Sequence, residues 1–162
     1  MDLAILGYGV VGSGTALLLQ KNAAVIDARI KQPLRLKYIL DIRDFPGDPM
    51  ESLITHDFGT ILNDPEVSVV AETMGGLHPA YEYVLACIQA GKSVVTPNKE
   101  LVAVKGWELM QAAKKHNVNF LFEASVGGGI PIIRPMTQCL AANELSEVTG
   151  ILNGTTNFIL TA

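Results

Sequence analysis

Short apolar runs alternate with amphipathic stretches along most of the chain. The run Leu3–Leu6 is continuously apolar and bounded by glycine, which is typical of a strand buried on both faces of a parallel sheet. By the same pattern we expect strands at residues 3–6, 34–40, 67–71, 93–95 and 119–122. Helical spacing of apolar residues predicts helices at residues 10–20, 25–30, 79–91 and 101–116, with a polar connection and one short helix at residues 42–63. This alternation predicts an α/β fold with a doubly wound parallel sheet.

The pattern changes after Phe122. Glycines at 127–129 are followed by an expected helix at residues 131–140, a strand at residues 144–152 and a new helix from residue 155. A lone strand with one short helix cannot build an independent sheet. We therefore expect a first domain at residues 1–130 and only the start of a truncated second domain at residues 131–162.

Composition excludes several classes of protein. The chain is 49% hydrophobic and 17% charged, so it can bury a core and does not have the composition of a disordered protein. Its net charge of −4 provides no basic surface for nucleic acid. No apolar run approaches the ~20 residues that a membrane span needs, and the first residues lack the features of a signal peptide. We therefore expect a cytoplasmic protein that binds neither nucleic acid nor membrane.

Cysteine and histidine offer no metal or catalytic cluster. Cys87 and Cys139 each lie in a helix-like apolar pattern without the close spacing of a zinc or redox motif, so both are predicted to be buried free thiols. His56, His78 and His116 are scattered along the chain and are interpreted as surface or structural residues.

The segment from Gly7 to Gly12 reads GYGVVG, a GxGxxG motif between the first strand and the first helix. In that position Gly7 permits the tight turn, Gly9 lets the backbone approach a pyrophosphate, and Gly12 allows close packing of helix on strand. The phosphates would lie on free N–H groups at the helix N-terminus. This context predicts a dinucleotide-binding loop of Rossmann type, and the alternative is a glycine-rich turn without a ligand.

Polar residues at later strand ends are candidates for the same site, because open parallel sheets bind ligands at their carboxyl edge. Asp41 ends the second strand and could accept hydrogen bonds from an adenosine ribose diol, which favours NAD. Arg43 could instead bind a 2′-phosphate, which favours NADP. Both could equally be solvated loop charges, so the sequence does not decide between the cofactors. Thr73 follows the third strand and offers a hydroxyl to the nicotinamide half, although a plain turn explains the same position.

Lys99 follows the fourth strand in the segment Thr96-Pro97-Asn98-Lys99. Pro97 stiffens this turn, so the lysine is expected to project into the cleft. There its ammonium could orient a substrate carboxylate or carbonyl, or support proton transfer. A solvated lysine at a helix start is the simpler alternative.

A glycine loop follows the fifth predicted strand, from Glu123 to Pro131. Its carbonyl oxygens together with the Glu123 carboxylate would suit a hard cation. The same glycines are also typical of an interdomain hinge, and the two interpretations are compatible.

Four segments in this order, GYGVVG, TPNKELVA, FEASVGGGIPII and GILNGTTNFIL, strongly resemble homoserine dehydrogenase. The resemblance spans nearly the whole chain and implies a Rossmann-type NAD or NADP domain followed by a substrate-binding and dimerising domain. It also implies cofactor contacts, with Lys99 near the hydride-transfer site, at Gly9, Val10, Val11, Gly12, Ser13, Gly14, Thr73 and Lys99. A monovalent-cation site, usually occupied by sodium, is implied at Glu123, Val126, Gly128 and Ile130. Asn153 to Thr156 would lie where the substrate domain begins.

The implied reaction is the interconversion of L-homoserine and L-aspartate 4-semialdehyde in threonine and methionine biosynthesis, by an enzyme that is a homodimer when complete. The acidic residues and second lysine with which the family binds this small substrate lie beyond the equivalent of Ala162. The chain alone is therefore expected to bind cofactor but to have little or no activity. The main alternative is a non-catalytic dinucleotide-binding or sensing module. A different aldehyde-linked dehydrogenase ranks third, because neither cysteine lies at a strand end.

Overall fold

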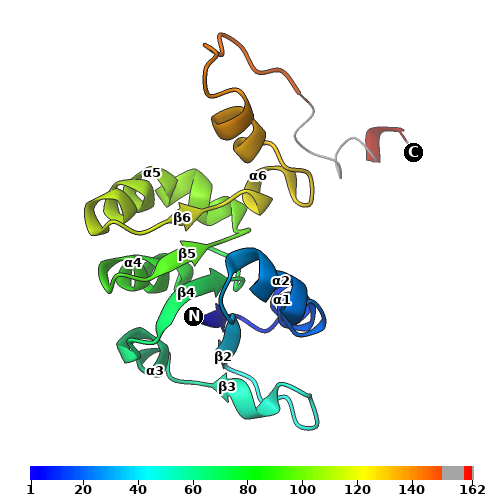
Figure 1. The fold of residues 1–162 in the computed structure, drawn as a ribbon, viewed down its shortest axis with the longest axis vertical. Helices are drawn as coiled ribbons and strands as arrows, with labels where there is room; N and C mark the ends of the chain where they lie inside the picture. Colours follow the sequence, from blue (N-terminus) through cyan, green and yellow to red (C-terminus); the bar gives the residue numbers. More distant parts are fainter. Residues whose placement is uncertain (151–158, 162) are drawn as a thin grey trace.

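The computed structural model describes residues 1–150 and 159–161 (Figure 1). Within them, six parallel strands form one sheet in the order β3-β2-β1-β4-β5-β6. The strands are β1 Asp2–Leu6, β2 Arg35–Leu40, β3 Ile54–Thr55, β4 Val67–Glu72, β5 Ser93–Val95 and β6 Phe120–Leu121. The order reverses at β1, with β2 on one side and β4 on the other, as in a doubly wound sheet. The predicted fold class is confirmed.

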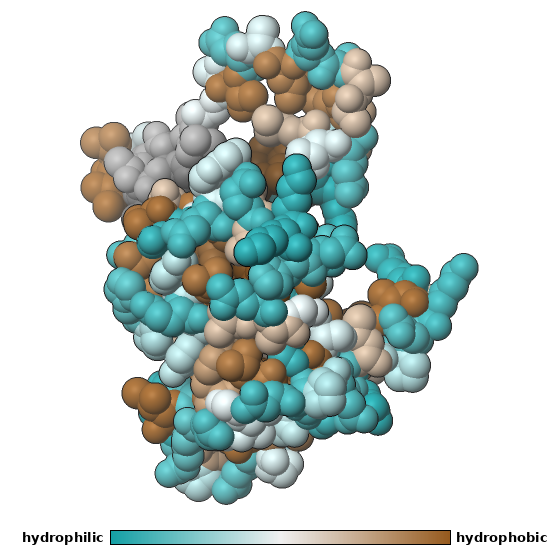
Figure 2. All heavy atoms as spheres, turned by 90° about the vertical axis from the view of Figure 1, so that its left-hand side faces the viewer, coloured by the Kyte–Doolittle hydropathy of each residue, from teal (hydrophilic) through white to brown (hydrophobic). Residues whose placement is uncertain are grey.

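Helices cover both faces of the sheet (Figure 1). They are α1 Val10–Lys21, α2 Ala23–Ile30, α3 Phe58–Asn63, α4 Ala80–Gln89, α5 Lys99–His116 and the single turn α6 Ala124–Gly127. The first two lie on one face, and α3, α4 and α5 lie on the other. Figure 2 shows the outward side of the layer formed by α3, α4 and α5. This side is mainly hydrophilic with separate apolar patches, as expected of a helix layer that meets solvent.

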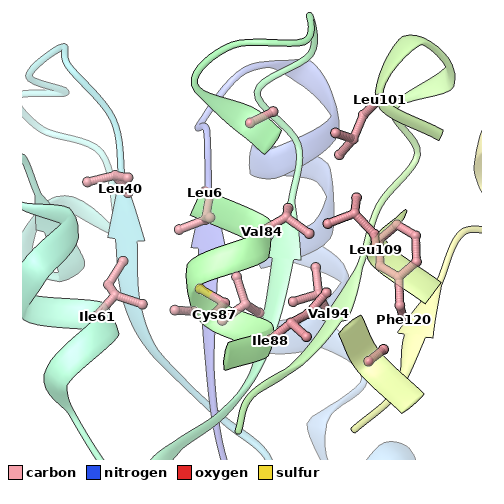
Figure 3. Close-up of a cluster of buried hydrophobic side chains, with 14 of the residues drawn as sticks. Leu6, Leu40, Ile61, Val84, Cys87, Ile88, Val94, Leu101, Leu109 and Phe120 are labelled. Carbon is pink, nitrogen blue, oxygen red and sulfur yellow. The ribbon is translucent and has the colours of Figure 1, made fainter. Parts of the chain in front are cut away.

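Two apolar clusters hold these layers together. Alternate side chains of β1 point to opposite faces, so Ala4 and Leu6 join the larger cluster while Leu3 and Ile5 join the smaller. The larger cluster lies between the sheet and α4 and α5 (Figure 3). All five residues of β1 are buried, which confirms the prediction of a strand covered on both faces.

Side-chain caps and left-handed residues set the ends of the long helix α5. The Asn98 carboxamide oxygen accepts the N–H of Leu101 at 3.1 Å and so satisfies one free donor of the first turn. Asn117 ends the helix in the left-handed conformation with φ of 55°. Three basic residues occupy the last turn, where they complement the helix dipole. The Asn98 cap thus sets the start of α5 at Lys99, shortly after the carboxyl end of β5.

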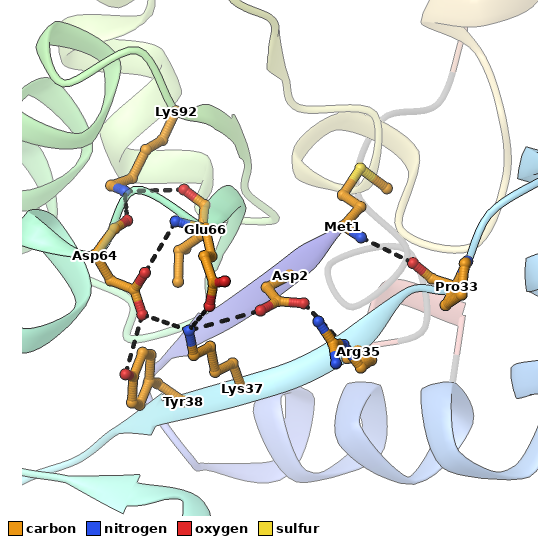
Figure 4. A network of polar contacts seen from close by, with 10 residues as sticks. Met1, Asp2, Pro33, Arg35, Lys37, Tyr38, Asp64, Glu66 and Lys92 are labelled. Atoms are coloured by element: carbon orange, nitrogen blue, oxygen red, sulfur yellow. Dashed lines mark hydrogen bonds and ion pairs between the residues drawn. The ribbon is translucent and has the colours of Figure 1, made fainter.

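A cluster of charged groups closes the amino edge of the sheet (Figure 4). Lys37 Nζ lies 2.7 Å from Asp64 Oδ2 and 2.5 Å from Glu66 Oε2. The buried Lys92 donates to the carbonyl oxygens of Asp64 and Val67 at 2.6 and 2.8 Å. These contacts join β2, β4 and the segment that leads into β5 at the edge opposite to the glycine loop.

The polar connection at residues 42–63 has more structure than the sequence indicates. The expected short helix is α3, whose first turn is capped by Asp57. The short 3₁₀ turn Glu51–Leu53 and the two-residue strand β3 were not predicted. Only Ile54 and Thr55 pair with β2, and two residues are too few to show a period in the sequence.

Beyond α6 the structure differs from the sequence-based expectations. The helix expected at residues 131–140 is a short helical segment with a π-turn at Pro135–Cys139. The strand prediction at residues 144–152 is wrong over residues 144–150, because a lone strand there has no neighbour to bond its backbone. Its last two residues, and the start of the helix expected from residue 155, lie outside the described residues.

The burial of the two cysteine thiols depends on this arrangement. Cys87 lies in the core between α4 and the sheet and is fully buried, as predicted. Cys139 is exposed, so the prediction of a buried thiol is wrong there. No second layer covers its segment within the described residues, and apolar side chains such as Ile130 and Val148 are likewise exposed. Of the helices that the structure describes, none is both long and apolar enough to cross a membrane.

Candidate functional site

The glycine loop joins β1 to α1 in a conformation that requires glycine. Gly7 has φ of +96°, in the region that side chains disfavour, and its N–H donates to Leu40 O at 2.8 Å. A Cβ on Gly12 would lie only 2.0 Å from Gly7 O, so the helix packs against the turn without room for a side chain. A Cβ on Gly9 would meet nothing within 4 Å. Open space therefore lies over the start of α1, at the position expected for phosphates.

A cavity of about 400 Å³ lies at the carboxyl edge of the sheet beside this loop. Its lining contains five predicted site residues, Gly7, Gly9, Asp41, Arg43 and Thr73. These residues follow β1, β2 and β4, whose carboxyl ends meet where the strand order reverses. That switch point is where doubly wound sheets bind their ligands.

Other predicted loop residues lie elsewhere. Val10, Ser13 and Gly14 line a second hollow of about 300 Å³ between α1 and the segment around Met50. Val11 and Gly12 line neither of these two cavities. Within the GxGxxG segment, Gly7 and Gly9 therefore face the larger cavity and Gly12 packs against the turn. Val10 and Val11 are exposed.

Asp41 and Arg43, the two alternatives for cofactor choice, contact each other. Asp41 Oδ1 accepts hydrogen bonds from Arg43 N and Nε at 3.0 and 2.9 Å, and Oδ2 accepts the Tyr8 N–H at 2.7 Å. The hydrogen bond from the Arg43 guanidinium, helped by these N–H groups, lowers the pKa of Asp41 to about 2. The carboxylate is thus ionised at neutral pH and anchors both the arginine and the glycine loop.

His56 also lines the cavity, and the sequence did not single it out as a site residue. Its Nδ1 lies 2.6 Å from Asp41 O and its Nε2 lies 2.9 Å from Asp44 Oδ1. The hydrogen bond to Asp41 O and the Asp44 carboxylate raise the pKa of this histidine. His56 lies at the cavity because it directly follows β3, the strand that was too short to predict. Tyr83 and Pro79 of the α4 side complete this wall of the cavity.

Thr73 uses its hydroxyl within the protein. Oγ1 lies 2.7 Å from Gly7 O, to which it donates, and so joins the loop after β4 to the glycine loop. The predicted hydroxyl for a nicotinamide group is therefore engaged in shaping the cavity wall. Its residue still borders the cavity.

Lys99 is the first residue of α5 and is exposed. Among the described residues it forms no ion pair, and it lies outside the lining of the 400 Å³ cavity. The preceding Asn98 is buried and donates to Gly76 O at 2.6 Å, which attaches the start of α5 to the loop after β4. The lysine thus stands at the carboxyl edge of β5, beside the loop that lines the cavity.

Glu123 is hydrogen-bonded to the segment that follows the glycine loop. Its carboxylate accepts the N–H groups of Ile132, Ile133 and Arg134 at 2.5, 2.8 and 2.9 Å. These bonds, above all the one from Ile132, lower the pKa of the carboxyl group. In the part of the chain that the structure describes, no group of three or more His, Cys, Asp or Glu residues is placed to hold a metal ion.

A doubly wound parallel sheet, a glycine turn that packs on a helix start, and a cavity at the switch point together define a Rossmann-type dinucleotide-binding domain. Residues 7–123 match the family profile "Homoserine dehydrogenase, NAD binding domain", and residues 131–162 match the profile "Homoserine dehydrogenase". The chain belongs to the homoserine dehydrogenase family. The resemblance noted in the sequence is confirmed, and the family consists of NAD(P)-dependent oxidoreductases.

Individual relatives agree with this assignment. Homoserine dehydrogenase of Mycobacterium tuberculosis is 42% identical over 164 residues, which cover 100% of this chain and 37% of that protein. The crystal structure of a homoserine dehydrogenase from Thiobacillus denitrificans matches with a TM-score of 0.89 and 41% identity, covering 99% of this chain and 38% of that one. A hyperthermophilic archaeal homoserine dehydrogenase in complex with NADPH shares the fold at a TM-score of 0.69 and 22% identity, covering 83% and 47% of the two chains.

The chain spans little more than a third of the length of the curated relatives it matches. It corresponds to their N-terminal part, which contains the NAD-binding domain. These matches favour the nucleotide-binding part of an enzyme over a non-catalytic sensing module.

Proposed function

We propose that this chain is the nucleotide-binding part of an enzyme that interconverts L-homoserine and L-aspartate 4-semialdehyde. The observation that carries the proposal is the cavity at the switch point, lined by Gly7, Gly9 and Asp41, in a chain of this family. When bound, the nicotinamide cofactor supplies the hydride chemistry. The chain's own residues hold that cofactor and orient the small-molecule substrate.

The glycine loop is proposed to bind the pyrophosphate. The open space at Gly9 and the N–H groups at the start of α1 fit a negatively charged group. The cofactor contacts proposed here are Gly7, Gly9, Val10, Val11, Gly12, Ser13, Gly14, Asp41, Arg43, Thr73 and Lys99. Asp41 and Arg43 would face the adenosine ribose, where the first favours NAD and the second favours the 2′-phosphate of NADP.

Lys99 is proposed as the catalytic residue of this part of the enzyme. An exposed ammonium at the carboxyl edge of β5 suits a substrate carboxylate or carbonyl, or the proton that leaves the alcohol. Residues 131–162 are proposed to open the substrate-binding and dimerising domain, beyond a first domain of residues 1–130. The complete enzyme would be a cytoplasmic homodimer that acts in threonine and methionine biosynthesis.

A sodium ion at Glu123, Val126, Gly128 and Ile130 is a separate proposal. The Glu123 carboxylate accepts three N–H groups, so in this conformation it does not fit the role of a cation ligand. Binding would therefore depend on backbone carbonyl oxygens, which are suitable donors for a hard cation. Titration with sodium chloride against an equal concentration of choline chloride, followed by thermal unfolding, tests it. Equal unfolding temperatures in the two salts contradict a sodium site.

Calorimetric titration of the chain with NADP and then NAD tests the nucleotide proposal. We expect binding of at least one dinucleotide by the wild-type chain. We expect none by Gly12→Ala, in which the new Cβ would block the glycine loop. A folded chain that binds neither dinucleotide contradicts the proposal. Activity is measured separately on the complete enzyme with homoserine and the preferred cofactor, because the substrate domain supplies further groups.

A further inference from the structure

Glu72 is a fully buried carboxylate at the carboxyl end of β4. Its Oε1 accepts the N–H groups of Met74 and Gly75 at 2.7 and 3.2 Å, and its Oε2 accepts the Thr96 hydroxyl at 2.5 Å. A buried carboxylate is costly unless hydrogen bonds replace its water. Here the replacement comes from two loops, one after β4 and the other after β5. The side chain therefore joins two segments that are separate in the sequence.

Further hydrogen bonds make this connection a closed ring. Thr96 Oγ1 accepts the N–H of Asn98 at 3.0 Å while it donates to Glu72. The Asn98 carboxamide donates to Gly76 O at 2.6 Å and its oxygen caps α5 at Leu101 N. The loop after β4 is thus held near its start by Glu72 and at Gly76 by Asn98.

The loop held in this way is part of the candidate site. Thr73, Met74 and Gly75 line the cavity, and Thr73 is bonded to the glycine loop through Gly7 O. Gly75 has φ of +78° and Gly76 has φ of +71°, so the loop contains two residues with wide conformational freedom. Without the carboxylate, this wall of the cavity would be free to take other conformations. On the other side of the ring, Asn98 immediately precedes Lys99.

We propose that Glu72 is a positioning residue that holds the loop of residues 73–76 and the start of α5 in register for the nicotinamide half of the dinucleotide. The inference rests on the proposed function. Glu72 touches no ligand and acts through Met74, Gly75 and Thr96. A carboxylate suits the position because both oxygens must accept, whereas a glutamine would present an NH₂ group to one of these donors. The adenosine half, at the β2 side of the cavity, does not depend on the ring.

The test compares two ligands on the same 162-residue chain. NADP or NAD carries the nicotinamide half, whereas ADP or adenosine 2′,5′-bisphosphate lacks it. In Glu72→Gln we expect the affinity for the dinucleotide to fall about tenfold, while that for the adenine nucleotide changes by less than about twofold. Thr96→Val removes the hydroxyl and should give the same selective loss. Thr96→Ser keeps the hydroxyl and should retain wild-type affinities.

Lys92→Met is the matched control, because Lys92 is also buried and hydrogen-bonded but lies at the amino edge of the sheet. It should lower the thermal unfolding temperature without changing the ratio of the two affinities. Equal losses for both ligands in Glu72→Gln, or no loss, overturn the inference while the wild-type chain still binds dinucleotide. If Glu72→Gln does not fold, the threonine pair decides, and Thr96→Val with the affinities of Thr96→Ser overturns it. A wild-type chain that binds no dinucleotide instead contradicts the proposed function, and this inference with it.

Discussion

The Arg43 guanidinium is paired with the Asp41 carboxylate at the rim of the cavity, with Nε 2.9 Å from Oδ1 and Nη2 3.1 Å from Oδ2. In the proposed site the two residues would favour different cofactors, and each is the other's ion-pair partner. A 2′-phosphate must draw Arg43 away from Asp41, and a ribose diol must share the carboxylate with Arg43. We therefore propose that cofactor choice is a competition within this pair.

Arg43→Gln should change the ratio of the affinities for the two cofactors. Loss of the guanidinium removes the charge that would meet a 2′-phosphate and leaves the Asp41 carboxylate free for a ribose diol. We expect affinity for NADP to fall about tenfold relative to that for NAD, measured by calorimetry at fixed ionic strength. Arg29→Gln, at the exposed end of α2, is the control. An unchanged ratio in Arg43→Gln contradicts a role in cofactor choice.

Gly12→Ala and Gly14→Ala form a matched pair in the same helix. A Cβ at Gly12 would lie 2.0 Å from Gly7 O, whereas one at Gly14 would meet nothing within 4 Å. Gly12→Ala should abolish dinucleotide binding and lower the free energy of unfolding by about 2 kcal/mol or more. Gly14→Ala should leave the free energy of unfolding unchanged or raise it by up to about 1 kcal/mol, because alanine favours a helix. Calorimetry measures dinucleotide binding and urea unfolding measures stability, and equal losses of stability in the two variants contradict the packing argument.

Acid should weaken the ion cluster at the amino edge of the sheet (Figure 4). The hydrogen bond from Lys37 lowers the pKa of Asp64 from 3.8 to about 2. A carboxyl group whose pKa is lower in the folded state stabilises the fold above its unfolded pKa. That contribution is lost as the pH falls through its folded pKa. Between about pH 5 and pH 2, Asp64→Asn and Lys37→Met should therefore lose less stability than the wild-type chain. Urea unfolding at each pH measures this, and wild-type pH dependence in both variants would count against it.

The two thiols should differ sharply in reactivity. Burial raises the pKa of Cys87 to about 12, whereas Cys139 is exposed. A chromogenic disulfide reagent should label one thiol of the native chain quickly and the second only in denaturant. Cys139→Ser should remove the fast labelling of the native chain and leave only the labelling of Cys87 in denaturant. Rapid labelling that persists in Cys139→Ser contradicts the burial of Cys87.

Lys99→Ala in the complete enzyme should lower turnover much more than cofactor affinity. The proposed task of the ammonium is to hold substrate or assist proton transfer, and the glycine loop is proposed to supply most of the cofactor contacts. We expect kcat to fall at least about a hundredfold with less than about a threefold change in the Kd for the cofactor. Lys114→Ala, in the last turn of the same helix, should leave both unchanged. Wild-type turnover in Lys99→Ala removes this residue from the proposed site.

Local patterns in the sequence were sufficient for the order of the long elements. The apolar run at Leu3–Leu6 and the helical spacing after Val10 each report on residues a few positions apart, and both agree with β1 and α1. Gly7 and Gly12 were recognised for the same reason, since a tight turn onto a helix has a short and specific signature. Where that local signal was weak, as in the two-residue β3, or a neighbour was lacking, as at residues 144–150, the predictions failed.

By itself the sequence determined the alternation of strands and helices, the glycine turn and the strand ends that carry polar residues, because backbone geometry and hydrophobic period act over short stretches. Only the tertiary structure decided which of those polar groups meet. It brought the Tyr8 N–H to Asp41, placed His56 at the cavity through β3, and hydrogen-bonded Glu72 to Thr96, which lies 24 residues further along the chain. Such contacts depend on strand order and on the burial of each group, which no single segment contains.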